Sequence, residues 1–142
     1  MPVCLAGEGI PVDKIRVLLA DDHPEMIATV RRTLGEEFEV IETAGNGQLA
    51  LNAVLSLHPD IFVTDISMPI LNGFQIASRI HKSNSRTRII FLTIHEDRDF
   101  LAAALSAGAA GYVIKPRLST DLVLAIHEVL KGNIFVSESM RV

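Results

Sequence analysis

Tryptophan is absent from this sequence, and its 142 residues include one cysteine, one tyrosine and only 5% aromatic residues. So few aromatic side chains argue against a platform on which nucleic-acid bases would stack. The single Cys4 has no partner for an internal disulfide bond, which is typical of a reducing compartment, so we expect a cytoplasmic location. No apolar run approaches the ~18 residues that a membrane span needs, and we expect no membrane association.

An excess of positive charge is also lacking. The chain has 13 Lys and Arg against 17 Asp and Glu, a formal net charge of -4 at pH 7. This balance argues against non-specific binding of these residues to DNA or to an anionic membrane. What the sequence does hold is 49% hydrophobic residues, enough to fill the core of one domain of this length.

Short β-branched runs alternate along the chain with longer segments of helical period. The predicted strands cover 15–20, 38–43, 60–65, 88–93 and 111–114. The predicted helices begin at Pro24, after the turn 45–47, and then cover 73–82, 97–107 and 120–131, with Ser119 as N-cap of the last. Five βα units in succession predict a parallel sheet with helices on both faces. The expected fold is therefore a flavodoxin-like (βα)5 three-layer sandwich with strand order 2-1-3-4-5.

The same pattern predicts how the chain is divided. Residues 1–13 show no clear period and are expected to be a mobile N-terminal extension. Residues 14–132 form the predicted domain, and residues 133–142 are expected to be a C-terminal tail or the start of a linker.

Polar side chains stand where the buried strands end. Asp21 and Asp22 follow the first strand, Asp65 the third, Thr93 ends the fourth, and Lys115 follows the fifth. In a sheet of this order, ligands bind at the carboxyl ends of the strands, next to the point between strands one and three where the order reverses. We therefore expect these five side chains to converge in one site.

Three carboxylates in one site repel one another unless a cation is supplied. Mg²⁺ suits such a site because it accepts carboxylate, water and phosphate oxygens, and the Lys115 ammonium adds a second positive charge. The site is thus prepared for added negative charge, such as a phosphoryl group in transfer. Asp65 lies centrally and is the best candidate for a nucleophile that forms an acyl phosphate.

Each of these residues also has an ordinary structural interpretation. An acid pair after a strand is usually a solvated turn, Asp65 alone could be a cap, and Lys115-Pro116 is usually part of a surface loop. Only the set, placed at successive strand ends, is hard to explain in this way.

Four segments of the chain together resemble the receiver domains of two-component response regulators, which are CheY-like. They are Leu18-Leu19-Ala20-Asp21-Asp22, the run DISMPILNG from Asp65 to Gly73, Leu92-Thr93, and the run GYVIKP from Gly111 to Pro116. The resemblance covers about residues 15–132. Asp22-His23-Pro24 and the segments 92–97 and 107–112 are most similar to NarL/FixJ-type regulators of the LuxR family.

The resemblance implies that Asp65 accepts a phosphoryl group from a sensor histidine kinase or a phosphotransfer protein. It also implies an Mg²⁺ or Mn²⁺ ion that Asp21 and Asp22 hold, directly or through water, together with Asp65 and the backbone carbonyl of Ser67.

Further roles follow from the same resemblance. Thr93 would bind a phosphoryl oxygen, Lys115 would pair with Asp65 and then with the phosphate, and Tyr112 would turn inward when Thr93 moves. A cis peptide bond would precede Pro116. Pro69 and Gly73 would shape the loop after the phosphoacceptor.

Phosphorylation adds ≈ −1.5 to −2 charges, and the resemblance implies that it switches the surface around the fourth strand, fourth helix and fifth strand. The expected protein is a regulatory phosphoacceptor and not an enzyme, apart from its own phosphorylation and slow autodephosphorylation. It would form a homodimer on phosphorylation and regulate transcription through a helix-turn-helix domain outside these 142 residues. A stand-alone receiver that acts through protein contacts is the alternative.

Three other classes compete with this interpretation. A Mg²⁺-dependent aspartyl-phosphate phosphohydrolase needs a second Asp two residues after the nucleophile, where this chain has Ser67. A nucleotide- or flavin-binding module needs a phosphate loop where this chain has its acid pair. A pseudo-receiver would lack part of the acidic set. The five histidines lie on different predicted elements and are expected to be surface or capping residues instead of metal ligands.

Overall fold

The computed structural model describes residues 14–141, and the extension predicted at 1–13 lies outside these described residues. It contains one parallel sheet in the order β2-β1-β3-β4-β5-β6. The strands are β1 (Ile15–Ala20), β2 (Phe38–Ala44), β3 (Ile61–Thr64), β4 (Arg88–Thr93), β5 (Gly111–Ile114) and β6 (Phe135–Val136). The predicted fold and the order 2-1-3-4-5 are confirmed, with β6 as an additional strand beside β5.

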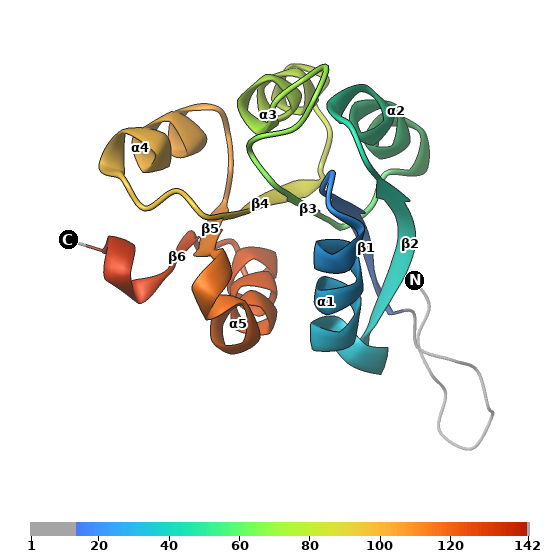
Figure 1. Cartoon of the computed structure of the whole chain (residues 1–142). Coiled ribbons are helices and arrows are strands. Elements are labelled where there is room, and N and C mark those ends of the chain that lie inside the picture. Colours follow the sequence, from blue (N-terminus) through green and yellow to red (C-terminus); the bar gives the residue numbers. More distant parts are fainter. Residues whose placement is uncertain (1–13, 142) are drawn as a thin grey trace.

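Within residues 14–141, five α-helices cover the two faces of the sheet (Figure 1). They are α1 (Pro24–Leu34), α2 (Gly47–Leu57), α3 (Gly73–Lys82), α4 (Arg98–Ser106) and α5 (Leu118–Leu130). Helices α2, α3 and α4 lie on one face, and α1 and α5 lie on the other. None of the helices in residues 14–141 is long and apolar enough to cross a lipid bilayer.

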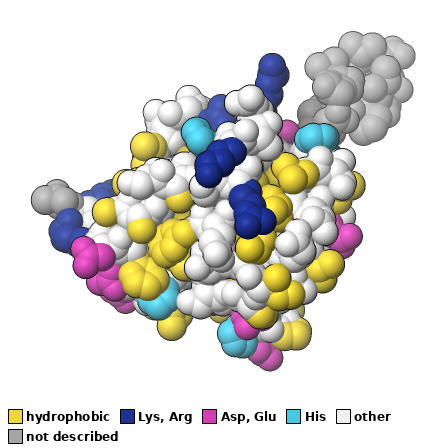
Figure 2. Space-filling model, turned by 90° about the horizontal axis from the view of Figure 1, so that it is seen from above, with side chains coloured by type: hydrophobic (Ala, Val, Ile, Leu, Met, Phe, Trp, Pro, Cys, Tyr) yellow, Lys and Arg dark blue, Asp and Glu magenta, His cyan; other side chains and the backbone are white. Residues whose placement is uncertain are grey.

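The central strands are buried on both faces, as their continuous apolar runs predict. Leu18, Phe62 and Phe91 point toward the α2–α4 layer. Their neighbours Leu19 and Val63 point toward α1 and α5. Two apolar cores therefore enclose the central strands, whose buried polar side chains, Thr64 and Thr93, lie at strand ends. The outer surface of the α2–α4 layer mixes apolar and basic side chains, with acidic side chains at its margins in this view (Figure 2).

Local signals fix most helix ends. Pro24 opens α1, where its missing N–H costs no hydrogen bond, and Gly35 with φ 63° ends it. The Asn72 side chain accepts a hydrogen bond from the N–H of Gln75, whose own side chain accepts one from the N–H of Asn72, so a capping box starts α3.

The predicted start of α5 is wrong. Ser119 is not the N-cap, because α5 begins at Leu118 and no side chain caps it. A 3₁₀ helix over Lys115–Arg117 leads directly into α5 and already turns the chain, so no separate cap is needed.

The C-terminal tail is part of the same sheet. The Phe135 N–H donates to the carbonyl of Ala110, and the Ser137 N–H donates to the carbonyl of Tyr112 at 2.9 Å. The buried Ser137 hydroxyl donates to Asp121 Oδ2 of α5 at 2.7 Å and accepts from the Ile114 N–H at 3.2 Å. The folded unit therefore extends past Gly132, where the sequence pattern places the end of the domain.

Candidate functional site

The acid residues are positioned by the strands that precede them. Ala20 at the end of β1 lies opposite Thr64 at the end of β3. One residue further, the Asp65 N–H donates to the Ala20 carbonyl at 3.0 Å, and the Asp21 N–H donates to the Ala44 carbonyl at 3.1 Å. These backbone hydrogen bonds continue the pairing of the strands by one residue, so the backbones of both aspartates are fixed side by side.

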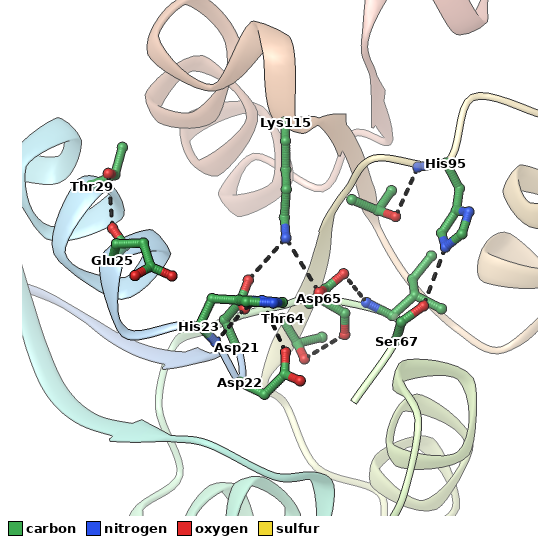
Figure 3. Close-up of polar contacts among 12 residues, drawn as sticks. Asp21, Asp22, His23, Glu25, Thr29, Thr64, Asp65, Ser67, His95 and Lys115 are labelled. Carbon is green, nitrogen blue, oxygen red and sulfur yellow. Dashed lines mark hydrogen bonds and ion pairs between the residues drawn. The ribbon is translucent and has the colours of Figure 1, made fainter. Parts of the chain in front are cut away.

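Lys115 bridges two of the carboxylates (Figure 3). Its Nζ lies 3.1 Å from Asp21 Oδ2 and 3.2 Å from Asp65 Oδ2. The three side chains are mostly buried, with exposed fractions of 12% for the lysine and 5% and 7% for the aspartates. Burial pulls the pKa of Lys115 down, but hydrogen bonds and charges from Asp21 and Asp65 together outweigh it, so the pKa is raised above its usual value. The lysine is therefore held as a cation.

The peptide bond before Pro116 was predicted to be cis, and this is wrong. No cis peptide bond occurs in residues 14–141. The trans form is favoured by about 0.5–1 kcal/mol before proline, and Lys115 reaches both carboxylates from the 3₁₀ turn with a trans bond.

Four side chains offer ligand atoms to one cation. One atom from each of Asp21, Asp22, His23 and Asp65 lies within 4.8 Å of the others. The carboxylates fit a hard divalent ion, because oxygen ligands of this kind are the ones that Mg²⁺ accepts. The structure thus assembles the three predicted acids and adds a histidine that the sequence analysis did not include.

His23 is the residue that the sequence analysis missed. Its Nδ1 lies 3.0 Å from Asp21 Oδ1 and 3.1 Å from Asp22 Oδ1. The hydrogen bond with Asp21, and then the charges of both acids, raise the pKa of His23. The sequence signal that could have identified His23 is its position between the acid pair and Pro24. Because α1 begins at Pro24, the residue before it stays next to Asp21 and Asp22.

Thr93 and Tyr112 meet at the backbone of His95. The Thr93 hydroxyl accepts a hydrogen bond from the His95 N–H at 3.1 Å, and the Tyr112 hydroxyl donates to the His95 carbonyl at 2.9 Å. Both side chains are fully buried. Tyr112 is therefore already turned inward while Thr93 is bound to the loop, and burial raises the pKa of Tyr112 to about 12.

Ser67 lies at the exposed rim of the site. Its Oγ is 3.2 Å from Nε2 of His95, and the His95 ring stacks on Phe100 at 4.1 Å between ring centroids. A hydroxyl therefore stands where a phosphohydrolase of the competing class would need a second carboxylate.

The loop after Asp65 is held tightly at Pro69 and Gly73. The Pro69 carbonyl accepts a hydrogen bond from the Gly47 N–H at 3.1 Å, and the Gly73 N–H donates to the Ile66 carbonyl at 2.7 Å. A Cβ at Gly73 would stand 2.9 Å from the Asp65 carbonyl oxygen, so only glycine fits without a shift.

Comparisons with known proteins agree on one family. The model of the response regulator receiver domain matches residues 17–127. The transcriptional regulatory protein MctR of Rhizobium johnstonii is 31% identical over 129 residues, which are 89% of this chain and 60% of MctR. The chain thus spans less than two thirds of this relative.

Solved structures give the same result. A two-component response regulator of the LuxR family from Aurantimonas sp. has a TM-score of 0.85 at 30% identity, over 90% of this chain and 93% of that one. The isolated receiver domain of RcsB from Salmonella enterica, solved with the phosphomimetic BeF3⁻, has a TM-score of 0.82 at 28% identity, over 90% and 96%.

Proposed function

Because the chain belongs to the response regulator receiver domain family, we propose that Asp65 is its phosphoacceptor. The observation that carries the proposal is the position of this carboxylate. Oδ1 accepts a hydrogen bond from the Ile66 N–H at 2.7 Å, and Oδ2 lies 3.2 Å from the Lys115 ammonium. The carboxylate is thus oriented on one side by the backbone and faces a cation on the other.

The proposed donor is a phosphohistidine of a sensor kinase or phosphotransfer protein. An Asp65 oxygen attacks the phosphorus, the P–N bond breaks with its electron pair left on the imidazole, and an acyl phosphate forms. The Lys115 ammonium follows the negative charge from the carboxylate to the phosphoryl group. An Mg²⁺ or Mn²⁺ ion, held by Asp21, Asp22, Asp65 and the Ser67 carbonyl, would neutralise charge on the transferred oxygens.

The output of the switch is proposed to run through Thr93 and Tyr112. Phosphorylation adds ≈ −1.5 to −2 charges and three acceptors, and we expect the buried Thr93 hydroxyl to move toward one of them and donate to it. The His95 backbone binds both Thr93 and Tyr112, so this movement changes the loop that leads into α4.

For the whole regulator we propose a cytoplasmic transcription factor that forms a homodimer on phosphorylation and contacts DNA through a helix-turn-helix domain. The relative MctR, a transcriptional regulatory protein by name, supports this role. The chain's own activity would be limited to its phosphorylation and slow autodephosphorylation.

Labelling with acetyl phosphate and Mg²⁺, read by intact mass, tests the proposal. The native chain should gain one phosphoryl group, and Asp65→Asn should gain none. Asp99→Asn, which removes an exposed carboxylate from α4, is the matched control and should label like the native chain. Labelling of Asp65→Asn at the native rate would place the acceptor elsewhere.

A further inference from the structure

The acidic pocket contains a histidine, His23, beside its carboxylates. The backbone N–H of His23 donates to Asp21 Oδ1 at 2.9 Å, and its ring Nδ1 lies 3.0 Å from the same oxygen. Although His23 occupies the N-cap position of α1, its side chain makes no capping hydrogen bond. The ring is instead directed at Asp21 and Asp22 (Figure 3).

The ligand atoms come close to the spacing that a first-row ion requires. At metal–ligand distances of about 2.1 Å, neighbouring ligands of an octahedral ion stand about 3.0 Å apart, and opposite ligands about 4.2 Å. The ring nitrogen lies 3.0 and 3.1 Å from the two carboxylate oxygens, and the four-residue set lies within 4.8 Å. Only small shifts would bring all four atoms into one coordination sphere.

Lys115 does not compete with the histidine for the same oxygen. Its ammonium contacts Oδ2 of Asp21, whereas the His23 ring contacts Oδ1. The ring is also more than half exposed, so it can turn toward an ion without disturbing the core. An imidazole ligand and a bound lysine are therefore compatible in this pocket.

We propose that His23 completes a mixed nitrogen and oxygen site that binds Ni²⁺ and Zn²⁺ through its imidazole, whereas Mg²⁺ uses only oxygen ligands and leaves the imidazole unbound. Imidazole is a good ligand for Ni²⁺ and Zn²⁺, while Mg²⁺ prefers oxygen and keeps its waters. The inference concerns the same pocket as the proposed function and rests on it for the role of Mg²⁺. A transition-metal ion bound here would compete with Mg²⁺ for the same carboxylates.

Calorimetric titration of the full, untagged chain tests the proposal. All proteins carry Cys4→Ser, because a thiolate would bind Zn²⁺ by itself. Any such site prefers Ni²⁺ to Mg²⁺ to some degree, so the comparison between variants decides. His23→Asn should weaken Ni²⁺ binding about tenfold or more, because even the loss of an outer-shell partner typically costs about 10–100-fold in metal affinity, and should leave Mg²⁺ binding nearly unchanged.

His127→Asn is the matched control, because His127 also pairs with a carboxylate, that of Glu37, but lies outside the cluster. It should leave the affinity for both ions unchanged. As a second measurement, Zn²⁺ should shift the ¹⁵N resonance of the His23 Nδ1 in the Cys4→Ser protein that retains His23.

Three results would overturn the inference. They are unchanged Ni²⁺ affinity in His23→Asn, an equal loss for Ni²⁺ and Mg²⁺, and an equal loss in His127→Asn. Acetyl phosphate labelling with Mg²⁺ separates this inference from the proposed function. A native chain that resists labelling would refute the phosphoacceptor without affecting the titration.

Discussion

Replacing Lys115 by methionine should destabilise the domain, because it removes the ammonium between two buried carboxylates. At an effective dielectric constant of about 20, each contact of 3.1 or 3.2 Å has a Coulomb energy of about 5 kcal/mol before desolvation is subtracted. Breaking a buried pair and leaving its partner charged typically costs about 3–5 kcal/mol. We expect about 3 kcal/mol, since methionine retains most of the side-chain volume.

Urea denaturation followed by circular dichroism in EDTA measures this loss. The midpoint should fall by about 1 M or more, given a slope of about 1–3 kcal/mol/M. Added MgCl₂ should reduce the difference, because a bound cation replaces part of the missing charge. Adding Asp65→Asn to the variant should recover stability, since one unpaired carboxylate is removed.

The pH dependence of the difference has a definite sign. The pKa of Lys115 is raised in the folded state, so its stabilisation is present below the ordinary value of about 10.4 and is lost as pH rises through the raised value. Lys131→Met is the matched control. Lys131 is largely exposed and lies 3.4 Å from Glu128, so its loss should cost less than about 1 kcal/mol. Equal stability of Lys115→Met and the native chain in EDTA would refute the reasoning.

Three further predictions concern groups around the site. Tyr112, the single tyrosine, should form phenolate only near pH 12 in ultraviolet titration of the folded protein, and near pH 10 in denaturant. Its contribution to folding stability is therefore fully present below about pH 10 and is lost as the pH rises from about 10 to about 12. A titration midpoint near 10 in the folded protein would contradict its burial. Ser137→Ala should lower the free energy of unfolding by about 1–3 kcal/mol in urea denaturation, because the buried carboxylate of Asp121 loses a hydrogen-bond donor. Ser139→Ala, at an exposed position, should change it by less than about 0.5 kcal/mol. Gly73→Ala should lower the free energy of unfolding by about 1–3 kcal/mol and slow acetyl phosphate labelling, because the new Cβ would collide with the backbone after β3. Gly45→Ala should do neither, because a Cβ at that position meets nothing within 4 Å.

The sequence predicts the elements best where local signals and burial agree. The bounds of α3, β4 and β5 are as predicted, since a capping asparagine, glycines and uninterrupted apolar runs mark them. The convergence of the acids with Lys115 was also predictable, because a parallel sheet brings its carboxyl strand ends to one edge.

What the sequence did not reveal depends on contacts between distant segments. β6 has only two residues, too few for a period, and it forms through backbone hydrogen bonds with Ala110 and Tyr112. The trans peptide bond before Pro116 and the start of α5 at Leu118 go together with the 3₁₀ helix over Lys115–Arg117, from which Lys115 reaches the carboxylates of distant strands. The direction of the His23 ring follows from the turn that its own backbone makes with Asp21.

The anchoring of the tail has a mechanical consequence. Ser137 is hydrogen-bonded to the backbone of β5 at both Tyr112 and Ile114, and its hydroxyl also donates a hydrogen bond to Asp121 of α5. The point where the polypeptide leaves the sheet therefore travels with the strand that carries Tyr112 and leads into Lys115. A displacement of β5 would therefore move Ser137 and the residues that follow it directly, with no other element between them.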